Sequence, residues 1–179
     1  RTARGWRPPR PALRIRRIPV TALPYRDNVG ACLFNAAGLV LVARRADMPN
    51  AEGPAGGWQL PQGGMDKGEN PRAAVFRELE EEIGTAKAEI LAEHPDWLFY
   101  DLPSDLIGKA LKGKYRGQRQ RWFAMRFLGE ESDIRLDLDP HPEFDSWRWV
   151  PLSMIPDLIV PFKRPIYEIL ARDFARFAA

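Results

Sequence analysis

Two short apolar runs joined by a turn open the patterned part of the chain. Residues 29–34 and 39–45 have the apolar, strand-forming composition of β-strands, and residues 35–38 between them suit a hairpin turn because they end in glycine. Further strand-like runs are predicted at residues 89–93, 97–100, 118–128 and 147–150. We expect the first two of these further runs to pair with each other across the segment 94–96.

Helical periodicity marks two longer segments. The first lies between Asn70, which suits a helix N-cap, and Gly84, which suits a left-handed helix end, and Pro71 fits its first turn. The second follows Pro165 and continues almost to the C-terminal residue, after a shorter helical turn at 153–159. Strands that alternate with helices predict an α/β fold, with helices packed on both faces of a mixed sheet.

Composition divides the chain into a tail and a body. Residues 1–24 contain seven arginines, five prolines and no acidic residue, so we expect a disordered tail followed by one domain at 25–179. The tail is compatible with a processed end, an upstream extension or a nucleic-acid-binding arm, and also with a solvated segment without a defined role. After residue 26 the chain holds 19 basic and 24 acidic residues, so the basic pI is a property of the tail.

Two further features bear on the cellular compartment. No stretch of the sequence approaches the length of a membrane span. The one cysteine, Cys32, excludes an internal disulfide and lies in an apolar run, where we expect it to be a small buried side chain. Both features favour a cytoplasmic protein.

Three carboxylates share one side of the first predicted helix. Glu78, Glu81 and Glu82 stand at i, i+3 and i+4, whereas Glu80 points elsewhere. Like charges at these spacings cost about 0.2–0.5 kcal/mol per pair on an exposed helix, and a bound cation would reverse that sign. Carboxylates are the ligands that Mg²⁺ and Mn²⁺ prefer. Taken alone, the cluster is equally compatible with a solvated acidic face.

The spacing of this cluster extends to the preceding loop. The pattern G-x5-E-x7-R-E-U-x-E-E-x-G-U, where U is aliphatic, is met by Gly63, Glu69, Arg77, Glu78, Glu81, Glu82 and Gly84. In this pattern the chain resembles the Nudix hydrolases, and it departs only at Thr85, where an aliphatic residue is usual. The resemblance implies an α/β/α sandwich and hydrolysis of a phosphoanhydride with Mg²⁺, or with Mn²⁺ or another divalent cation.

The resemblance also implies roles for individual residues. The implied metal ligands are the carbonyl of Gly63 and the carboxylates of Glu78, Glu81, Glu82 and Glu143. The implied catalytic residues are Arg77, Glu81, Glu82 and Glu143. Among them Arg77 would brace the glutamates and the loop, with Glu69 orienting it, and Glu143 would be a metal ligand or the general base. Without the family, Glu143 is better explained as an ordinary loop acid.

The rest of the body resembles one branch of that family. The segments 25–30, 58–64, 117–123, 142–149 and 162–164 resemble the bacterial RNA pyrophosphohydrolases, which are close to the dinucleoside polyphosphate (diadenosine tetraphosphate) hydrolases. On that resemblance Arg26, Arg45 and Lys163 would bind phosphates and Phe162 would stack on a base. The alternative for these four is a surface charge or a core aromatic.

A basic strip completes the candidate chemistry. Its members are Lys109, Lys112, Lys114, Arg116, Arg119 and Arg121, beside Tyr115, Trp122 and Phe123. Such a strip suits a nucleic-acid backbone or a polyphosphate chain. The strip does not separate these two substrates, but the resemblance implies an RNA 5′-pyrophosphohydrolase that initiates RNA decay, with a diadenosine tetraphosphate hydrolase as the alternative. A non-catalytic RNA-binding module is the third hypothesis, and the intact glutamate set argues against it.

Overall fold

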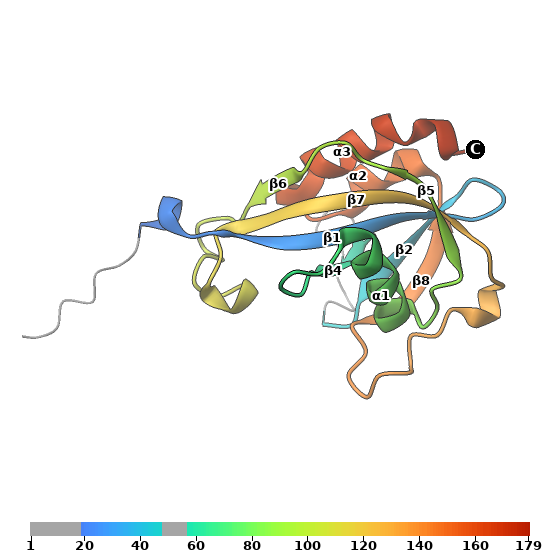
Figure 1. The fold of residues 1–179 in the computed structure, drawn as a ribbon, viewed down its shortest axis with the longest axis horizontal. Coiled ribbons are helices and arrows are strands. Elements are labelled where there is room, and N and C mark those ends of the chain that lie inside the picture. Colours follow the sequence, from blue (N-terminus) through green and yellow to red (C-terminus); the bar gives the residue numbers. More distant parts are fainter. Residues whose placement is uncertain (1–18, 48–56) are drawn as a thin grey trace, which may run out of the picture.

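The computed structural model describes residues 19–47 and 57–179 (Figure 1). Most of the predicted tail, residues 1–24, lies outside the described residues, and its last part contains a 3-10 turn at Val20–Ala22 where we predicted no structure. In the described ranges, no helix is both long and apolar enough to cross a membrane.

A mixed sheet forms the centre of the fold. The strands of the described residues are β1 (Tyr25–Phe34), β2 (Val40–Arg45), β3 (Trp58–Gln59), β4 (Gln62–Gly64), β5 (Ala88–Glu93), β6 (Leu98–Asp101), β7 (Gly117–Phe127) and β8 (Phe144–Val150). The long strands β1 and β7 lie parallel, and the other pairs among these strands are antiparallel.

The β1–β2 hairpin opens immediately after its turn. β1 and β2 pair only at Phe34 and Val40; β2 then continues against β3 and β8, while the first half of β1 pairs with β4. This divergence brings β4, which carries Gly63 and Gly64, alongside Val29 and Asn28. The glycine loop is thereby fixed at the middle of the sheet.

Helices cover both faces of the sheet, as the sequence predicted. α1 (Pro71–Ile83) packs on one face against a core that includes Val29, Leu41 and Phe123. α2 (Ile155–Leu158) and α3 (Arg164–Asp173) pack on the other face, where Cys32 and Trp122 are fully buried. Neighbouring residues of β1 and β7 alternate between the two cores because strand side chains alternate in direction.

The ends of α1 follow the local signals in the sequence. The Asn70 side chain accepts hydrogen bonds from the backbone N–H groups of Arg72 and Ala73, and Pro71 occupies the first turn. Gly84 ends the helix in the left-handed region at φ 77°, and its N–H donates to the carbonyl of Glu80. These caps confirm the predicted helix bounds.

The predicted pairing of the third and fourth strands is wrong. β5 and β6 do not pair with each other; both pair with β7, one after the other along its length. His94 lies between β5 and β6 and fixes the chain there. Its backbone N–H donates to the carbonyl of Trp122, and its Nε2 lies 2.8 Å from Asp173 Oδ2. This anchor to β7 and α3 keeps the chain running along one edge and prevents a hairpin.

Two strands are longer than predicted. β1 begins at Tyr25 although its first residues are polar, because β7 pairs with it from Tyr25 onward and β4 pairs with it from Asn28. β8 begins at Phe144, whose buried ring packs in the core beneath α1.

Candidate active site

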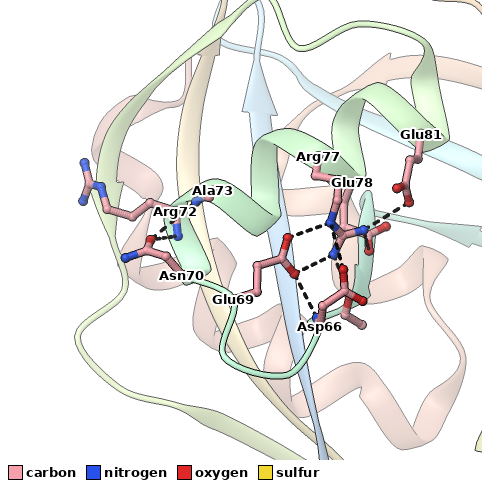
Figure 2. A network of polar contacts seen from close by, with 9 residues as sticks. Asp66, Glu69, Asn70, Arg72, Ala73, Arg77, Glu78 and Glu81 are labelled. Atoms are coloured by element: carbon pink, nitrogen blue, oxygen red, sulfur yellow. Dashed lines mark hydrogen bonds and ion pairs between the residues drawn. The ribbon is translucent and has the colours of Figure 1, made fainter.

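Arg77 connects the glycine loop to the acidic side of α1. Its guanidinium donates five hydrogen bonds: two to Glu69 at 2.7 and 2.8 Å, one to Glu78 at 2.9 Å, one to Glu81 at 3.1 Å and one to the carbonyl of Gly64 at 3.0 Å (Figure 2). A guanidinium has five N–H donors, so all of them are used within the protein.

Glu69 is the partner that fixes this guanidinium. Its carboxylate accepts the bidentate pair from Arg77 and a further hydrogen bond from the backbone N–H of Asp66 at 2.9 Å. The hydrogen bonds from Arg77, followed by the one from Asp66, lower the pKa of Glu69 to about 2. Glu69 therefore stays ionised and orients Arg77, as the sequence suggested.

Glu78 and Glu82 form the buried half of the acidic cluster. Both are nearly inaccessible, and both line a cavity of about 490 Å³ together with Glu143 from the loop before β8. The backbone N–H of Gln62 donates to Glu82 Oε2 at 3.0 Å, whereas Glu82 Oε1 is buried without a hydrogen-bond partner among the described residues.

Burial makes these three carboxylates difficult to ionise together. It raises the pKa of Glu82 well above its ordinary value, and the charges of Glu143 and Glu78 raise it further. Burial likewise raises the pKa of Glu78, against the hydrogen bond from Arg77, and that of Glu143, against the charge of Arg45. A positive charge among them would relieve this penalty.

Glu81 lies apart from the other two. Its side chain is 58% exposed, contacts Arg77 and does not line the cavity. We predicted that the three glutamates share one face of the helix, but they separate into two groups. Glu78 and Glu82 line the cavity, and Glu81 lies beside the guanidinium of Arg77 (Figure 2).

Gly63 and Gly64 are glycines because the site leaves no room for a side chain. A Cβ on Gly63 would lie 2.0 Å from the carboxyl carbon of Glu78, and one on Gly64 would lie 2.1 Å from Nη2 of Arg26. The loop backbone thus approaches both an acidic and a basic side chain of the cavity.

The donor set fits a divalent cation in its chemistry. Oxygen ligands suit Mg²⁺ and Mn²⁺, and Oε1 of buried Glu82 has no hydrogen-bond partner among the described residues. Within those residues, no three His, Cys, Asp or Glu side chains form a ready-made metal cluster; Glu78 and Glu81 are bonded to Arg77 instead. Ion binding would need those two side chains to exchange partners.

Basic and aromatic side chains line the same cavity. Arg26, Arg45, Phe162 and Lys163, which the sequence singled out, are all found there. Arg45 is bonded to the carboxylate of Asp47 at 2.8 and 2.9 Å. Burial, with a contribution from the positive charge of Arg45, lowers the pKa of Lys163 to about 8.

Several residues that line the cavity were not predicted from the sequence. The polar ones are Asn28, Gln62, Tyr100 and Gln118, and the apolar ones are Leu102, Leu106, Ala110 and Leu111. Their signal in the sequence was weak: Gln118 belongs to a strand with polar residues at successive positions, which indicates that both faces meet something polar.

A second cavity carries less chemistry. It has a volume of about 640 Å³ and is lined mainly by alanine, proline, leucine and glycine, with Glu168 as its one ionisable side chain among the described lining residues. It lacks the opposed acidic and basic groups of the smaller cavity, so we place the candidate site at the smaller one.

The chain shares its sequence pattern with known proteins. Residues 24–170 match the NUDIX domain. The RNA pyrophosphohydrolase of Acidiphilium cryptum (strain JF-5) is 65% identical over 159 residues, which cover 88% of this chain and 94% of the relative. That of Gluconacetobacter diazotrophicus is 60% identical over 158 residues, covering 87% and 95%.

Solved structures share the fold at lower identity. The E. coli dihydroneopterin triphosphate pyrophosphohydrolase superposes with a TM-score of 0.60 at 18% identity, covering 84% of this chain and 99% of the other. A C. elegans Ap4A hydrolase gives a TM-score of 0.59 at 23% identity, covering 85% and 96%. At these identities the likeness concerns the fold alone.

Proposed function

The chain belongs to the Nudix family, and we propose that it is a magnesium-dependent hydrolase that removes pyrophosphate from the 5′-triphosphate end of RNA. The observation that carries the proposal is that one cavity is lined both by acidic side chains (Glu78, Glu82 and Glu143) and by basic ones (Arg26, Arg45 and Lys163). A polyphosphate substrate with a divalent cation needs both. The relatives named RNA pyrophosphohydrolase, at 60% and 65% identity over most of their length, support RNA as the substrate.

The acidic side chains of the cavity would hold the cation. Glu78, Glu82 and Glu143 are the proposed carboxylate ligands, with Glu81 and the carbonyl of Gly63 as further ligands. When bound, a magnesium ion neutralises phosphate charge and activates water. Arg77 is a positioning residue in this proposal, because its five donors are all bonded to the glutamates and the loop.

The basic side chains of the cavity would bind and orient the triphosphate. Arg26, Arg45 and Lys163 donate to phosphate oxygens, and Phe162 offers its ring to a base. The oxygen of a water then bonds to the phosphorus nearest the RNA. The bond from that phosphorus to the bridging oxygen breaks, so pyrophosphate leaves and a 5′-monophosphate remains. Glu143 is the proposed base for the water proton, because its carboxylate lines the cavity where the phosphate chain would lie.

Hydrolysis of diadenosine tetraphosphate is the second candidate function, since the same cavity accommodates a base joined to a phosphate chain. The test gives purified protein, with magnesium, triphosphorylated RNA and diadenosine tetraphosphate and compares kcat/KM. We expect RNA to be preferred. A preference of more than about 100-fold for the dinucleotide, or about 2.7 kcal/mol in transition-state terms, would refute the RNA assignment.

The metal assignment has its own test. Glu81→Gln and Glu82→Gln are expected to lose most turnover while circular dichroism shows the fold intact. Glu80→Gln is the matched control, because Glu80 is exposed on the same helix and does not line the cavity. Unchanged turnover in both test variants would contradict the assignment. RNA retention without hydrolysis of either substrate by the wild type would favour a binding module.

We place the reaction in the bacterial cytoplasm, where its RNA substrate is made.

A further inference from the structure

Arginine and aromatic side chains cluster on the sheet beyond the first turn of α1. The Arg–aromatic strip, as we name it, consists of Tyr25, Trp97, Phe99, Arg116, Arg119 and Arg121. Phe99 of β6 stands directly opposite Arg119 of β7, and Val29, opposite Arg121, is buried beneath α1. Residues opposite each other in a sheet share a face, so the strip continues the face that α1 covers.

The members of the strip are stacked on one another. The guanidinium carbons of Arg119 and Arg121 lie 4.6 and 5.2 Å from the ring centroid of Trp97. Arg116 lies 4.8 Å from the ring centroid of Tyr25, whose ring meets that of Phe99 edge to face at 5.0 Å. Cation–π and aromatic contacts of this kind hold the side chains in place before any ligand arrives.

The aromatic residues beside the basic ones differ from those that the sequence predicted. Trp122 and Phe123 are fully buried, so they offer no surface to a ligand. The aromatic rings beside the arginines are those of Tyr25, Trp97 and Phe99, and Phe99 is 52% exposed. A half-exposed phenylalanine ring can stack on a planar ligand, and the arginines around it attract a ligand that is also anionic.

Charge around the strip favours a polyanion. Residues 102–121 contain six lysines and arginines and one aspartate, and Lys109, Lys112 and Lys114 are exposed. The strip arginines are paired with Asp101, Asp27 and Glu93. Such surface pairs are weak and leave other guanidinium donors free to bind a phosphate.

One loop, residues 102–116, connects the strip with the candidate active site. Leu106, Ala110 and Leu111 line the cavity and lie in the loop between β6 and β7 (Figure 1). The same loop ends at Arg116, a member of the strip. From residue 117 to residue 121, β7 extends the strip by about 13 Å. Tyr100 and Gln118, the neighbours of Phe99 and Arg119 in sequence, face the cavity from the opposite side of the sheet.

We propose that the Arg–aromatic strip binds the single-stranded nucleotides that follow the reacting 5′ end of an RNA substrate. Bases stack on Phe99, phosphates bind Arg116, Arg119 and Arg121, and the lysines of the 102–116 loop accompany the chain from the cavity to the strip. Aromatic rings with basic side chains are the usual means of binding single strands without sequence preference. The inference deepens the proposed function and rests on it for the identity of the substrate.

The first test measures binding without hydrolysis. Anisotropy of a labelled, 5′-hydroxyl, twenty-nucleotide single-stranded RNA is followed with the full chain and with the variant Phe99→Ala/Arg119→Gln. We expect affinity to fall by about tenfold or more and its salt dependence to weaken. Leu128→Ala and Arg135→Gln are matched controls, because they remove an exposed apolar residue and an exposed, carboxylate-paired arginine elsewhere. Phe99→Trp should retain binding, and thermal melts verify that each variant is folded.

The second test separates the strip from the cavity. For the double variant, kcat/KM should fall by a similar factor with a long triphosphorylated RNA and stay at the wild-type value with a triphosphorylated dinucleotide. Equal RNA affinity in the variant and wild type, or equal losses with both substrates, would overturn the proposal. Since 5′-hydroxyl RNA carries no triphosphate, the binding test decides the strip's role even where wild-type hydrolysis of RNA is absent.

Discussion

Replacement of Arg77 by glutamine gives the sharpest test of how the site is held together. The guanidinium joins Glu69, Glu78, Glu81 and the carbonyl of Gly64 through five hydrogen bonds (Figure 2). Glutamine keeps part of the apolar stem but loses the charge and most of the donors. The carboxylates would then stand close together without a compensating cation.

The cost follows from the burial of the partners. Glu78 is only 7% exposed, and burial already raises its pKa, so loss of Arg77 leaves a carboxylate that is expensive to ionise. Removing one partner of a buried ion pair costs about 3–5 kcal/mol. Because Arg77 is 28% exposed and Glu81 58%, we take the lower end, about 3 kcal/mol. For a chain of this size, that corresponds to a melting temperature lower by about 6–12 °C.

The assay is urea and thermal unfolding followed by tryptophan fluorescence, together with turnover. Arg135→Gln is the control, because Arg135 makes the same two-bond pair with Asp137 at an exposed site. We expect the control to melt within about 2 °C of wild type. In Arg77→Gln, kcat should fall more than KM rises, since the residue positions Glu78 and does not touch substrate. Equal melting temperatures for the two variants would refute the reasoning.

Three other predictions follow from the same geometry. Magnesium should raise the melting temperature of the wild-type protein more than that of Glu82→Gln, because a cation relieves the buried charges only where they exist; equal shifts would count against the metal site. Gly63→Ala should lower kcat with the fold retained, since the new methyl group would lie 2.0 Å from the Glu78 carboxyl carbon, and an unchanged kcat would be the contrary result. Arg172 and His94 lower the pKa of Asp173 from 3.8 to about 2, so its stabilisation is present above pH 3.8 and is lost as pH falls toward 2. Wild-type melting temperature should therefore fall more steeply than that of Asp173→Asn over this range, and parallel curves would contradict the contribution.

Local signals were sufficient for the helix that carries the glutamates. Asn70, Pro71 and Gly84 act on the backbone within one turn, so the sequence alone set the bounds of α1. Which glutamates enter the cavity was a harder question. At 3.6 residues per turn, Glu78 and Glu82 form one i, i+4 pair and Arg77 and Glu81 form the adjacent one. The structure follows that division, which the hypothesis of three glutamates on one face had overlooked.

Long-range pairing accounts for what the sequence could not predict. We expected a hairpin of β5 and β6 because the two strands are neighbours in the sequence. In the structure both strands pair with β7, and buried His94 fixes the chain between them. Tyr100 and Gln118 were missed as cavity residues for the same reason. They occupy opposite positions on two neighbouring strands, and that register is absent from local patterns.

The register of β8 against β2 shows how a site can depend on pairing that no motif records. The pairing shifts between Arg44 and Arg45, so that Arg45 lies opposite Phe144 and Arg44 instead bonds Asp145 at 2.8 Å. The carbonyl of Glu143 then accepts from the N–H of Ala46, which holds its loop at the end of β2. A slip of one residue would turn every side chain of β8 to the other face of the sheet and remove Glu143 from Glu82. Glu82 and Glu143 therefore meet because of a bulge between β2 and β8, which are distant in sequence. The acidic side chains of the cavity are brought together by this strand pairing as much as by the helix.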